Sequence, residues 1–225
     1  MARSDSHDRI TMAMLEEAKD KVMMGAERRS LIITEKEKRI TACHEAGHAT
    51  VAWMLPGADP VHKVTIIPRG KALGLTMQLP EEEKLSHSST YLFNNICTLF
   101  GGRVAEEIVF DEVTTGAGND IERASGLARS MVCEWGMSSE LGPVLFKVSD
   151  PLNGQPGHIM SEETARAVDS EVKKLISRAY NTARDILLSN REVLDGMTEM
   201  LLEKETIDRH DIENIVKRHG RTAQG

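Results

Sequence analysis

The chain has 225 residues and a formal net charge of −7, with 40% hydrophobic and 28% charged residues. This length and apolar content allow one large buried core or two small ones, which excludes a disordered protein. The acidic balance excludes nucleic-acid binding, which depends on a basic surface. Aromatic residues at 4% beside 12 methionines favour an aliphatic core between packed helices.

Apolar side chains recur at helical spacing through most of the sequence. In chain order, the helices that this spacing predicts lie at residues 11–29, 34–55, 88–110, 119–135 and 161–188, with two more that begin near 190 and 208. Thr34 and Glu37 have the spacing of a capping box, in which each side chain accepts a hydrogen bond from the other residue's backbone. Gly101 and Gly102 weaken the third helix, and therefore indicate that another backbone packs closely against it.

Two extended segments separate the second predicted helix from the third. Residues 61–67 (VHKVTII) and 72–79 (ALGLTMQL) are mostly β-branched or aliphatic, and each is followed by a proline. They predict a small β-hairpin or edge pair. Since helical segments far outweigh extended ones, the predicted fold class is mainly α, with a small β-hairpin or edge strand.

The second predicted helix contains His44-Glu45-Ala46-Gly47-His48, an H-E-x-x-H sequence. Residues four apart lie one turn above each other, so both imidazoles can bind one metal ion. Glu45 is rotated about 100° around the helix from His44, where its carboxylate can flank a metal-bound water. Zinc held by three protein ligands lowers the pKa of its water to about 7, and a carboxylate can then take the proton. The pattern predicts a helical zinc metallopeptidase with Glu45 as general base.

The alternative interpretation is a pair of ordinary helix histidines beside a surface glutamate. Small residues around the motif favour the metal site, because they leave room for metal and substrate. Val51 and Met54 stand where a metzincin has glycine and histidine, which excludes that class. The sequence contains no G-x-S-x-G and no Walker A pattern, so we expect neither serine-hydrolase chemistry nor ATP binding by this chain.

A third metal ligand has to come from another segment. The acidic candidates near predicted helix ends are Glu106, Glu107, Asp111, Asp120 and Glu122. Close packing of the glycine-containing helix would bring Glu106 or Glu107 near the histidines, as a ligand or as a group that orients a histidine. Asp120 follows a glycine-rich loop in the first turn of a helix, where its carboxylate can reach a metal or simply cap the helix. The spacing alone does not choose among them.

Val64, Thr65, Ile66 and Ile67 form a short β-branched run that ends at a proline. The unpaired N–H and C=O groups of an edge strand are a template for pairing with another chain. We therefore expect this run to be an edge strand beside the metal that pairs with an extended polypeptide substrate.

Three cysteines, Cys43, Cys97 and Cys133, are widely spaced, which predicts buried free thiols in a reducing compartment. No apolar run approaches the ~20 residues that cross a bilayer. The N-terminus lacks the apolar core of a signal peptide. We expect the chain as given to be soluble.

Six segments in order resemble the FtsH family of ATP-dependent zinc proteases. They are AKDKVMMGAERRS (18–30), TACHEAGHA (41–49), DPVHKVTIIPRGKALG (59–74), FGGRVAEEIVF (100–110), TTGAGNDIERA (114–124) and WGMSSELGPVLF (135–146). The resemblance continues more loosely through 161–172 and 202–208, and so covers nearly all of residues 12–215. Six ordered blocks make it more specific than a single motif.

The resemblance implies that His44, His48 and Asp120 bind one Zn²⁺ per chain, with Glu45 as the catalytic base. Glu106 or Glu107 would then at most contact a metal ligand, without binding the metal itself. The family's proteases are homo-hexamers with transmembrane segments and an ATP-using AAA+ module. They are bound to the bacterial inner membrane facing the cytoplasm, or to an organelle inner membrane, and degrade misassembled membrane proteins and short-lived soluble proteins. Membrane association of this chain would come only through segments outside it.

By the same resemblance, residues 1–30 are the tail of the AAA+ lid and a linker. Residues 31–220 are the zinc peptidase domain, with a catalytic part at 34–158 and a C-terminal helical part at 159–220. Two other functions stay open. A free-standing zinc aminopeptidase would need a site for the substrate's terminal amine. A non-enzymatic assembly module would use the C-terminal helices for oligomerisation, which leaves the intact H-E-x-x-H sequence unexplained.

Overall fold

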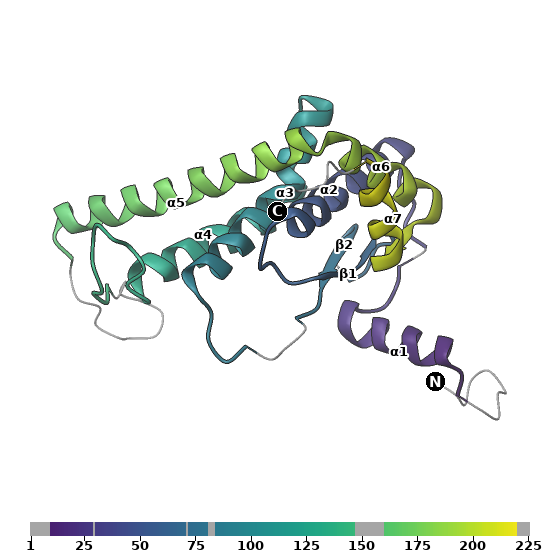
Figure 1. Cartoon of the computed structure of the whole chain (residues 1–225), viewed down its shortest axis with the longest axis horizontal. Coiled ribbons are helices and arrows are strands. Elements are labelled where there is room, and N and C mark those ends of the chain that lie inside the picture. The colour runs from purple at the N-terminus through teal and green to yellow at the C-terminus, as the bar shows by residue number, and fades with distance from the viewer. Residues whose placement is uncertain (1–9, 29, 71, 81–83, 147–159, 220–225) are drawn as a thin grey trace.

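The computed structural model describes residues 10–28, 30–70, 72–80, 84–146 and 160–219 (Figure 1). Within these ranges the helices are α1 (Met12–Met24), α2 (Glu35–Met54), α3 (Ser89–Phe110), α4 (Gly118–Cys133), α5 (Glu162–Ser189), α6 (Arg191–Lys204) and α7 (Arg209–His219). A 3-10 turn, η1 (Thr115–Ala117), precedes α4, and the strands are β1 (Val61–Thr65), β2 (Leu75–Gln78) and β3 (Thr206–Asp208). The predicted mainly α class is confirmed. The predicted division at 158–159 lies outside the described residues, as does the start of the predicted N-terminal segment.

Helix α2 lies at the centre of the fold and carries the H-E-x-x-H sequence. The predicted capping box holds its first turn. Thr34 Oγ1 accepts from the Glu37 N–H at 3.2 Å, and Glu37 Oε2 accepts from the Thr34 N–H at 3.0 Å. From Thr41 to Ala52 nearly every residue is buried, because α3, α6 and the sheet pack around the helix. Figure 1 shows α2 beside α3, with the long helix α5 running over α3 and α4.

Two glycines let the backbones of α2 and α3 come into direct contact. A Cβ atom on Gly47 would lie 2.4 Å from the carbonyl oxygen of Gly101, and one on Gly101 would lie 2.6 Å from that of Gly47. No side chain larger than hydrogen fits between the helices at this point. The close approach that the two glycines of α3 predict is confirmed.

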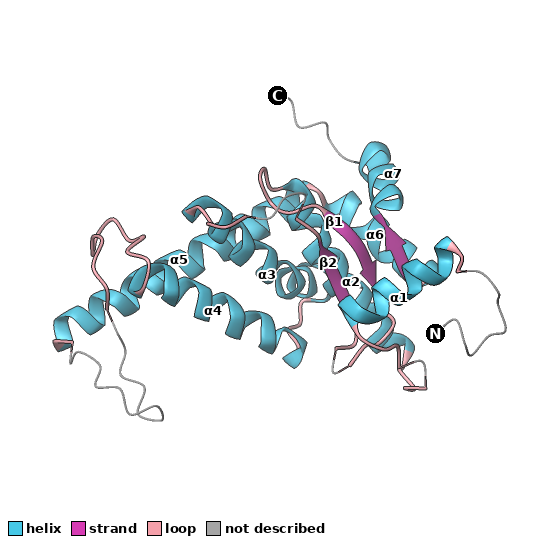
Figure 2. Cartoon of the chain, turned by 90° about the horizontal axis from the view of Figure 1, so that it is seen from below, coloured by secondary structure: helices cyan, strands magenta, loops and turns pink. Residues whose placement is uncertain are grey.

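The sheet is antiparallel with the strand order β2-β1-β3, as Figure 2 shows. Val64 in β1 pairs with Thr76 in β2 on one side and with Ile207 in β3 on the other. The prediction of a free edge at Val64–Ile67 is therefore wrong. The third strand comes from a segment 140 residues further along, where Glu205 O accepts from the Thr65 hydroxyl. Among the strands that the structure describes, the edge strand that packs on α2 is β2, and no described strand pairs with its outer side.

The segment after α1 is bound to the turn that leads into β2. The Arg69 guanidinium donates to the carbonyl oxygen of Gly25 at 2.9 Å and to Glu27 Oε1 at 2.7 Å. The Arg28 side chain donates to the carbonyl oxygen of Gly70 at 2.8 Å. These contacts fix the start of β2 from outside the sheet.

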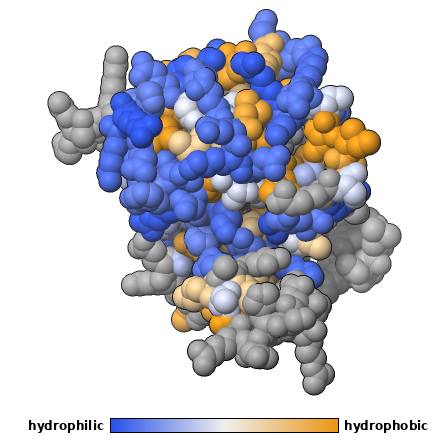
Figure 3. Space-filling view, turned by 90° about the vertical axis from the view of Figure 1, so that its right-hand side faces the viewer, coloured by the Kyte–Doolittle hydropathy of each residue, from blue (hydrophilic) through white to orange (hydrophobic). Residues whose placement is uncertain are grey.

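The surface is mainly hydrophilic on the face shown in Figure 3, with separate hydrophobic patches. Buried apolar residues from α2 through α7 and from the sheet form one continuous core. Among the helices that the structure describes, none is both long enough and apolar enough to cross a membrane.

The α2–α3 contact makes a testable prediction about stability. We expect Gly47→Ala to lower the free energy of unfolding by about 1–3 kcal/mol, because the added methyl group forces the helices apart. Urea unfolding of the metal-free protein measures this. Gly126→Ala in α4 is the matched control, since a Cβ there meets nothing within 4 Å, and it should stabilise by about 0.5–1 kcal/mol. A Gly47→Ala protein as stable as the unchanged chain would contradict the close contact.

Candidate metal centre

His44 and His48 project from adjacent turns of α2 toward α3, as residues four apart on a helix do. Their ring centroids lie 4.6 Å apart with an interplanar angle of 81°. The two Nε2 atoms are 3.0 Å from each other. Both imidazoles therefore present the same ring nitrogen to one point.

Two acceptors on α3 fix the orientation of these rings. His44 Nδ1 lies 2.6 Å from Glu106 Oε1, and His48 Nδ1 lies 2.7 Å from the carbonyl oxygen of Thr98. Carbonyl and carboxylate oxygens only accept hydrogen bonds, so both Nδ1 atoms carry the proton and donate. Both Nε2 atoms then face the centre of the cluster, where a bound cation would take the place of any proton on them.

Glu106 and Gly102, both in α3, border the His44 ring. Glu106 is only 2% exposed, and its second oxygen, Oε2, accepts from the Thr114 N–H at 3.0 Å. A Cβ atom on Gly102 would lie 2.5 Å from Nε2 of His44. Glycine at this position therefore leaves the space that the ring occupies.

Asp120 completes the cluster from the first turn of α4. Its Oδ2 lies 3.3 Å from the Nε2 atoms of both His44 and His48. The loop before α4 brings it there, with the Thr114 side chain capping η1 by accepting from the Gly116 N–H. Among the described residues, the ligand atoms that converge in this way are those of His44, His48 and Asp120.

The electrostatics of the cluster favour positive charge at its centre. Burial lowers the pKa of His44, but hydrogen bonds to the carboxylates of Asp120 and Glu106 outweigh it and raise this pKa to about 10. Burial raises the pKa of Asp120, but the two histidines outweigh it and hold this pKa well below its usual range. Two carboxylates therefore stay ionised around the imidazoles, which is the environment that a bound cation requires.

Glu45 lies beside the two histidines with its carboxylate turned toward β2. The residue is 7% exposed, and its Oε2 accepts from the Thr76 hydroxyl at 2.8 Å. Burial raises the pKa of Glu45 above the ordinary carboxylate value, while His48, His44 and Thr76 act in the opposite direction. Glu45 is thus a buried acid that borders the cluster, and its carboxylate oxygens are not among the converging ligand atoms.

The other predicted site residues lie elsewhere. Glu107, one position after Glu106, accepts from Arg103 Nε at 3.0 Å and pairs with the Tyr180 hydroxyl. Asp111 ends α3 in a left-handed conformation, and Glu122 is exposed. Thr65 and Val64 lie in the central strand, and Ile66 donates its N–H to the carbonyl oxygen of Glu205 at 2.9 Å.

Three residues that contact the predicted site were missed from the sequence. Thr98 contributes a backbone carbonyl, which any residue type has, so the sequence holds no signal for it. Thr76 in β2 and Gly74 just before it approach the Glu45 side chain. Their proximity depends on how the sheet packs on α2, which no local pattern encodes.

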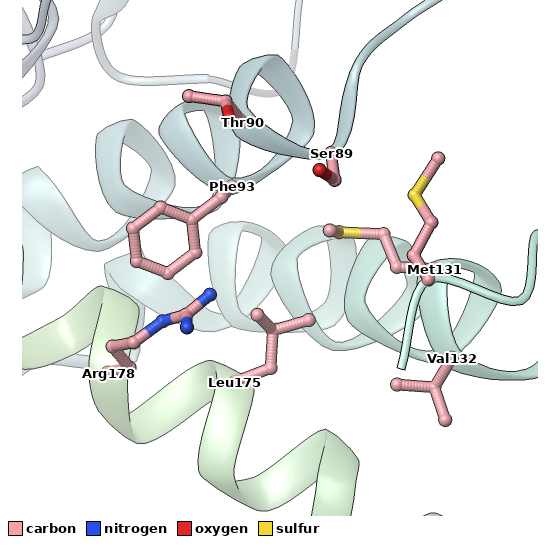
Figure 4. A pocket seen from close by; sticks show the side chains of 8 residues that line it. Ser89, Thr90, Phe93, Met131, Val132, Leu175 and Arg178 are labelled. Atoms are coloured by element: carbon pink, nitrogen blue, oxygen red, sulfur yellow. The ribbon is translucent and has the colours of Figure 1, made fainter. Parts of the chain in front are cut away.

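A separate pocket of about 190 Å³ lies between α3, α4 and α5 (Figure 4). Its lining includes Phe93, Leu175 and Arg178, and the Arg178 guanidinium lies 4.4 Å from the centre of the Phe93 ring. None of its lining residues belongs to the metal cluster. The pocket therefore plays no part in the chemistry of that cluster.

The chain is similar to bacterial proteins named "ATP-dependent zinc metalloprotease FtsH". It is 53% identical to that of Magnetococcus marinus over 90% of this chain and 31% of the relative. The identity is 52% for Acidobacterium capsulatum, over 92% of this chain and 33% of the relative, and 47% for Myxococcus xanthus, over 98% and 35%. The chain spans about a third of the length of these curated relatives. Residues 31–215 match peptidase family M41, and the chain therefore belongs to that family.

Proposed function

We propose that this chain is the peptidase domain of an FtsH-type protease and that it hydrolyses internal peptide bonds with a bound Zn²⁺. The observation that carries the proposal is the convergence of two imidazole nitrogens and one carboxylate oxygen beside a buried glutamate. The names of the relatives, which describe zinc metalloproteases, support the choice of metal.

In this proposal His44, His48 and Asp120 hold the zinc. Their ligand atoms lie 3.0–3.3 Å apart. A tetrahedral site with bonds of about 2.0–2.1 Å places neighbouring ligands about 3.3–3.4 Å apart, so the cluster has the right size. A zinc ion held by these three residues would lower the pKa of a water molecule at the site and would polarise the peptide carbonyl. Glu106 and the Thr98 carbonyl keep the two rings turned toward the metal.

Glu45 is the proposed general base. Its place next to His44 in the sequence puts it at the edge of the cluster, and burial raises its pKa toward the pH at which a base works well. The carboxylate takes a proton from the attacking water and can return it to the leaving amine. Asp120 and Glu106 do not serve in this role, because both are occupied by the histidines.

The free edge of β2 is the proposed docking site for the substrate. This corrects the sequence-based choice of residues 64–67, of which Val64 and Thr65 lie in the central strand and Ile66 donates its N–H to Glu205. An extended polypeptide that pairs with β2 would run past Glu45, because Gly74 and Thr76 of this segment contact the Glu45 side chain.

The proposal also covers the complete protease of which this chain would be one part. We propose that ATP-driven delivery, membrane anchoring and a hexameric ring come from regions outside this chain, and that the substrates are misassembled membrane proteins and short-lived soluble proteins. Residues 1–30 would then be the tail of an ATPase lid with a linker, and residues 31–220 the peptidase domain. The word "ATP-dependent" in the relatives' names supports the first of these points.

The first test separates this function from its alternatives. We expect cleavage of an internally quenched peptide that is blocked at both ends, loss of cleavage on chelation, and recovery on addition of Zn²⁺. A free-standing aminopeptidase would not cleave a blocked peptide. Glu45→Gln should lower kcat by about 10²–10⁴-fold, as the loss of a general base does, with zinc content unchanged. Stoichiometric zinc without any hydrolysis by the unchanged chain would support an assembly module instead.

The second test concerns the ligands and uses neighbouring acids as controls. Glu106→Gln should weaken zinc binding by roughly 10–100-fold, as is typical for a residue that hydrogen-bonds to a metal ligand. Asp120→Asn should weaken it by more, because it changes a proposed ligand. Competition with a fluorescent zinc chelator measures both. Glu107→Gln is the matched control and should leave affinity unchanged, because Glu107 pairs with Arg103 and Tyr180. Equal losses for Glu106→Gln and Glu107→Gln would refute the assigned orientation of α3.

The third test concerns the docking edge. In an extended peptide bound to β2, every second N–H faces the strand. Single backbone N-methyl groups placed along a substrate should therefore reduce kcat/KM at alternate positions by about tenfold, the worth of roughly one hydrogen bond. N-methyl groups at the intervening positions serve as controls. A loss without this alternation would argue against strand pairing.

A further inference from the structure

We infer that Thr76 is a positioning residue that holds the Glu45 carboxylate in its working orientation. The inference rests on the proposed function, in which Glu45 is the general base. It adds a residue of the docking strand β2 to the residues that determine the rate of the chemical step.

The Thr76 hydroxyl bridges the side chain and the backbone of one residue. Its Oγ1 lies 2.8 Å from Glu45 Oε2 and 3.0 Å from the carbonyl oxygen of Glu45. Both acceptors share the single hydroxyl proton. A glutamate side chain has several rotatable bonds and loses substantial conformational entropy when it is fixed. The bridge ties the far end of this side chain to its own backbone, and so favours one rotamer.

Gly74 provides a second, independent contact between the same strand segment and the same carboxylate. A Cβ atom at position 74 would lie 2.7 Å from Glu45 Oε1 and 2.9 Å from Thr41 Cγ2. Residues two apart in an extended segment face the same side. Gly74 therefore lets the backbone pass close to one carboxylate oxygen, while the Thr76 side chain holds the other.

The surroundings of Glu45 explain why it needs a hydrogen-bond donor. The carboxylate is buried, and its charged neighbours are the cluster residues His44, His48 and Asp120. A buried carboxylate without a donor is costly and turns toward any available partner. The nearest cationic partner would be the histidine pair, where Glu45 would compete with Asp120. The hydroxyl on β2 keeps the carboxylate on the substrate side of the cluster.

Thr76 also connects substrate binding to the base. Its backbone lies in the strand whose free edge is the proposed docking site, while its side chain faces α2. A substrate paired with that edge would hold in place the strand that holds the base. Because the side chain faces away from the edge, its loss should affect the chemical step and not the binding of substrate.

The experiment compares three variants of the zinc-loaded protein. Thr76→Val keeps the shape and removes the hydroxyl, and should lower kcat by on the order of ten- to a hundredfold with KM within about twofold. Thr76→Ser keeps the hydroxyl and should recover most of kcat. Thr206→Val is the matched control, because its hydroxyl lies 2.8 Å from Thr65 Oγ1 on the far side of the sheet. It should leave kcat unchanged. Zinc content should be the same in all three.

A second measurement uses the metal-free protein and does not depend on activity. We expect Thr76→Val to lower the midpoint of thermal unfolding more in the presence of Glu45 than in a Glu45→Ala background, because only the carboxylate is left without its donor. The Thr206→Val control should give the same shift in both backgrounds.

The outcomes distinguish the inference from the function on which it rests. Equal kcat values for Thr76→Val and Thr76→Ser would overturn the role of Thr76 and leave the proposed function standing. So would equal shifts of the unfolding midpoint in the presence of Glu45 and in the Glu45→Ala background. A higher KM with an unchanged kcat in Thr76→Val would also overturn it. An unchanged chain that binds zinc and does not cleave peptides would overturn the proposed function, and the role of Thr76 with it.

Discussion

The backbone contact between α2 and α3 at Gly47 and Gly101 is the constraint on which the site depends. It sets the distance at which α3 can reach the imidazoles of α2. The Thr98 carbonyl is 2.7 Å from His48 and the Glu106 carboxylate is 2.6 Å from His44, so a separation larger by the width of a methyl group would break both hydrogen bonds. Without them the tautomer and the direction of both rings would be undetermined.

The fold holds several polar side chains in its interior next to this contact. Glu45, His48 and Glu106 are all buried, next to a core of small apolar residues. Both buried carboxylates have a donor: Glu106 accepts from His44 and Thr114, and Glu45 accepts from Thr76. The partly buried Asp120 faces the Nε2 atoms of both histidines. A divalent cation would offset negative charge of these carboxylates, and its binding should therefore stabilise the fold as well as enable the chemistry.

Sequence reasoning succeeded where a pattern is local and failed where a contact is long-range. The capping box of Thr34 and the histidine pair depend on residues three or four apart, which helical geometry fixes. Glu106 and Glu107 could not be separated, because the choice depends on the rotation of α3 about its own axis. That rotation is set by the glycine contact, and it turns Glu106 toward His44 of α2 and Glu107 toward Tyr180 of α5. The partner of β1 could not be found either, since β3 has three residues and no distinct pattern.

The position of β3 connects the C-terminal helices to the site. These helices contribute none of the proposed ligands, yet α6 packs on α2, and the turn after it delivers β3 to β1. Glu205, in a left-handed conformation at the end of α6, starts this strand and accepts the N–H of Ile66 at 2.9 Å. By pairing with one side of β1, β3 leaves β2 as the edge that borders Glu45. The C-terminal part of the chain therefore helps to determine which strand is open to a substrate in the proposed docking, although it contributes none of the proposed metal ligands.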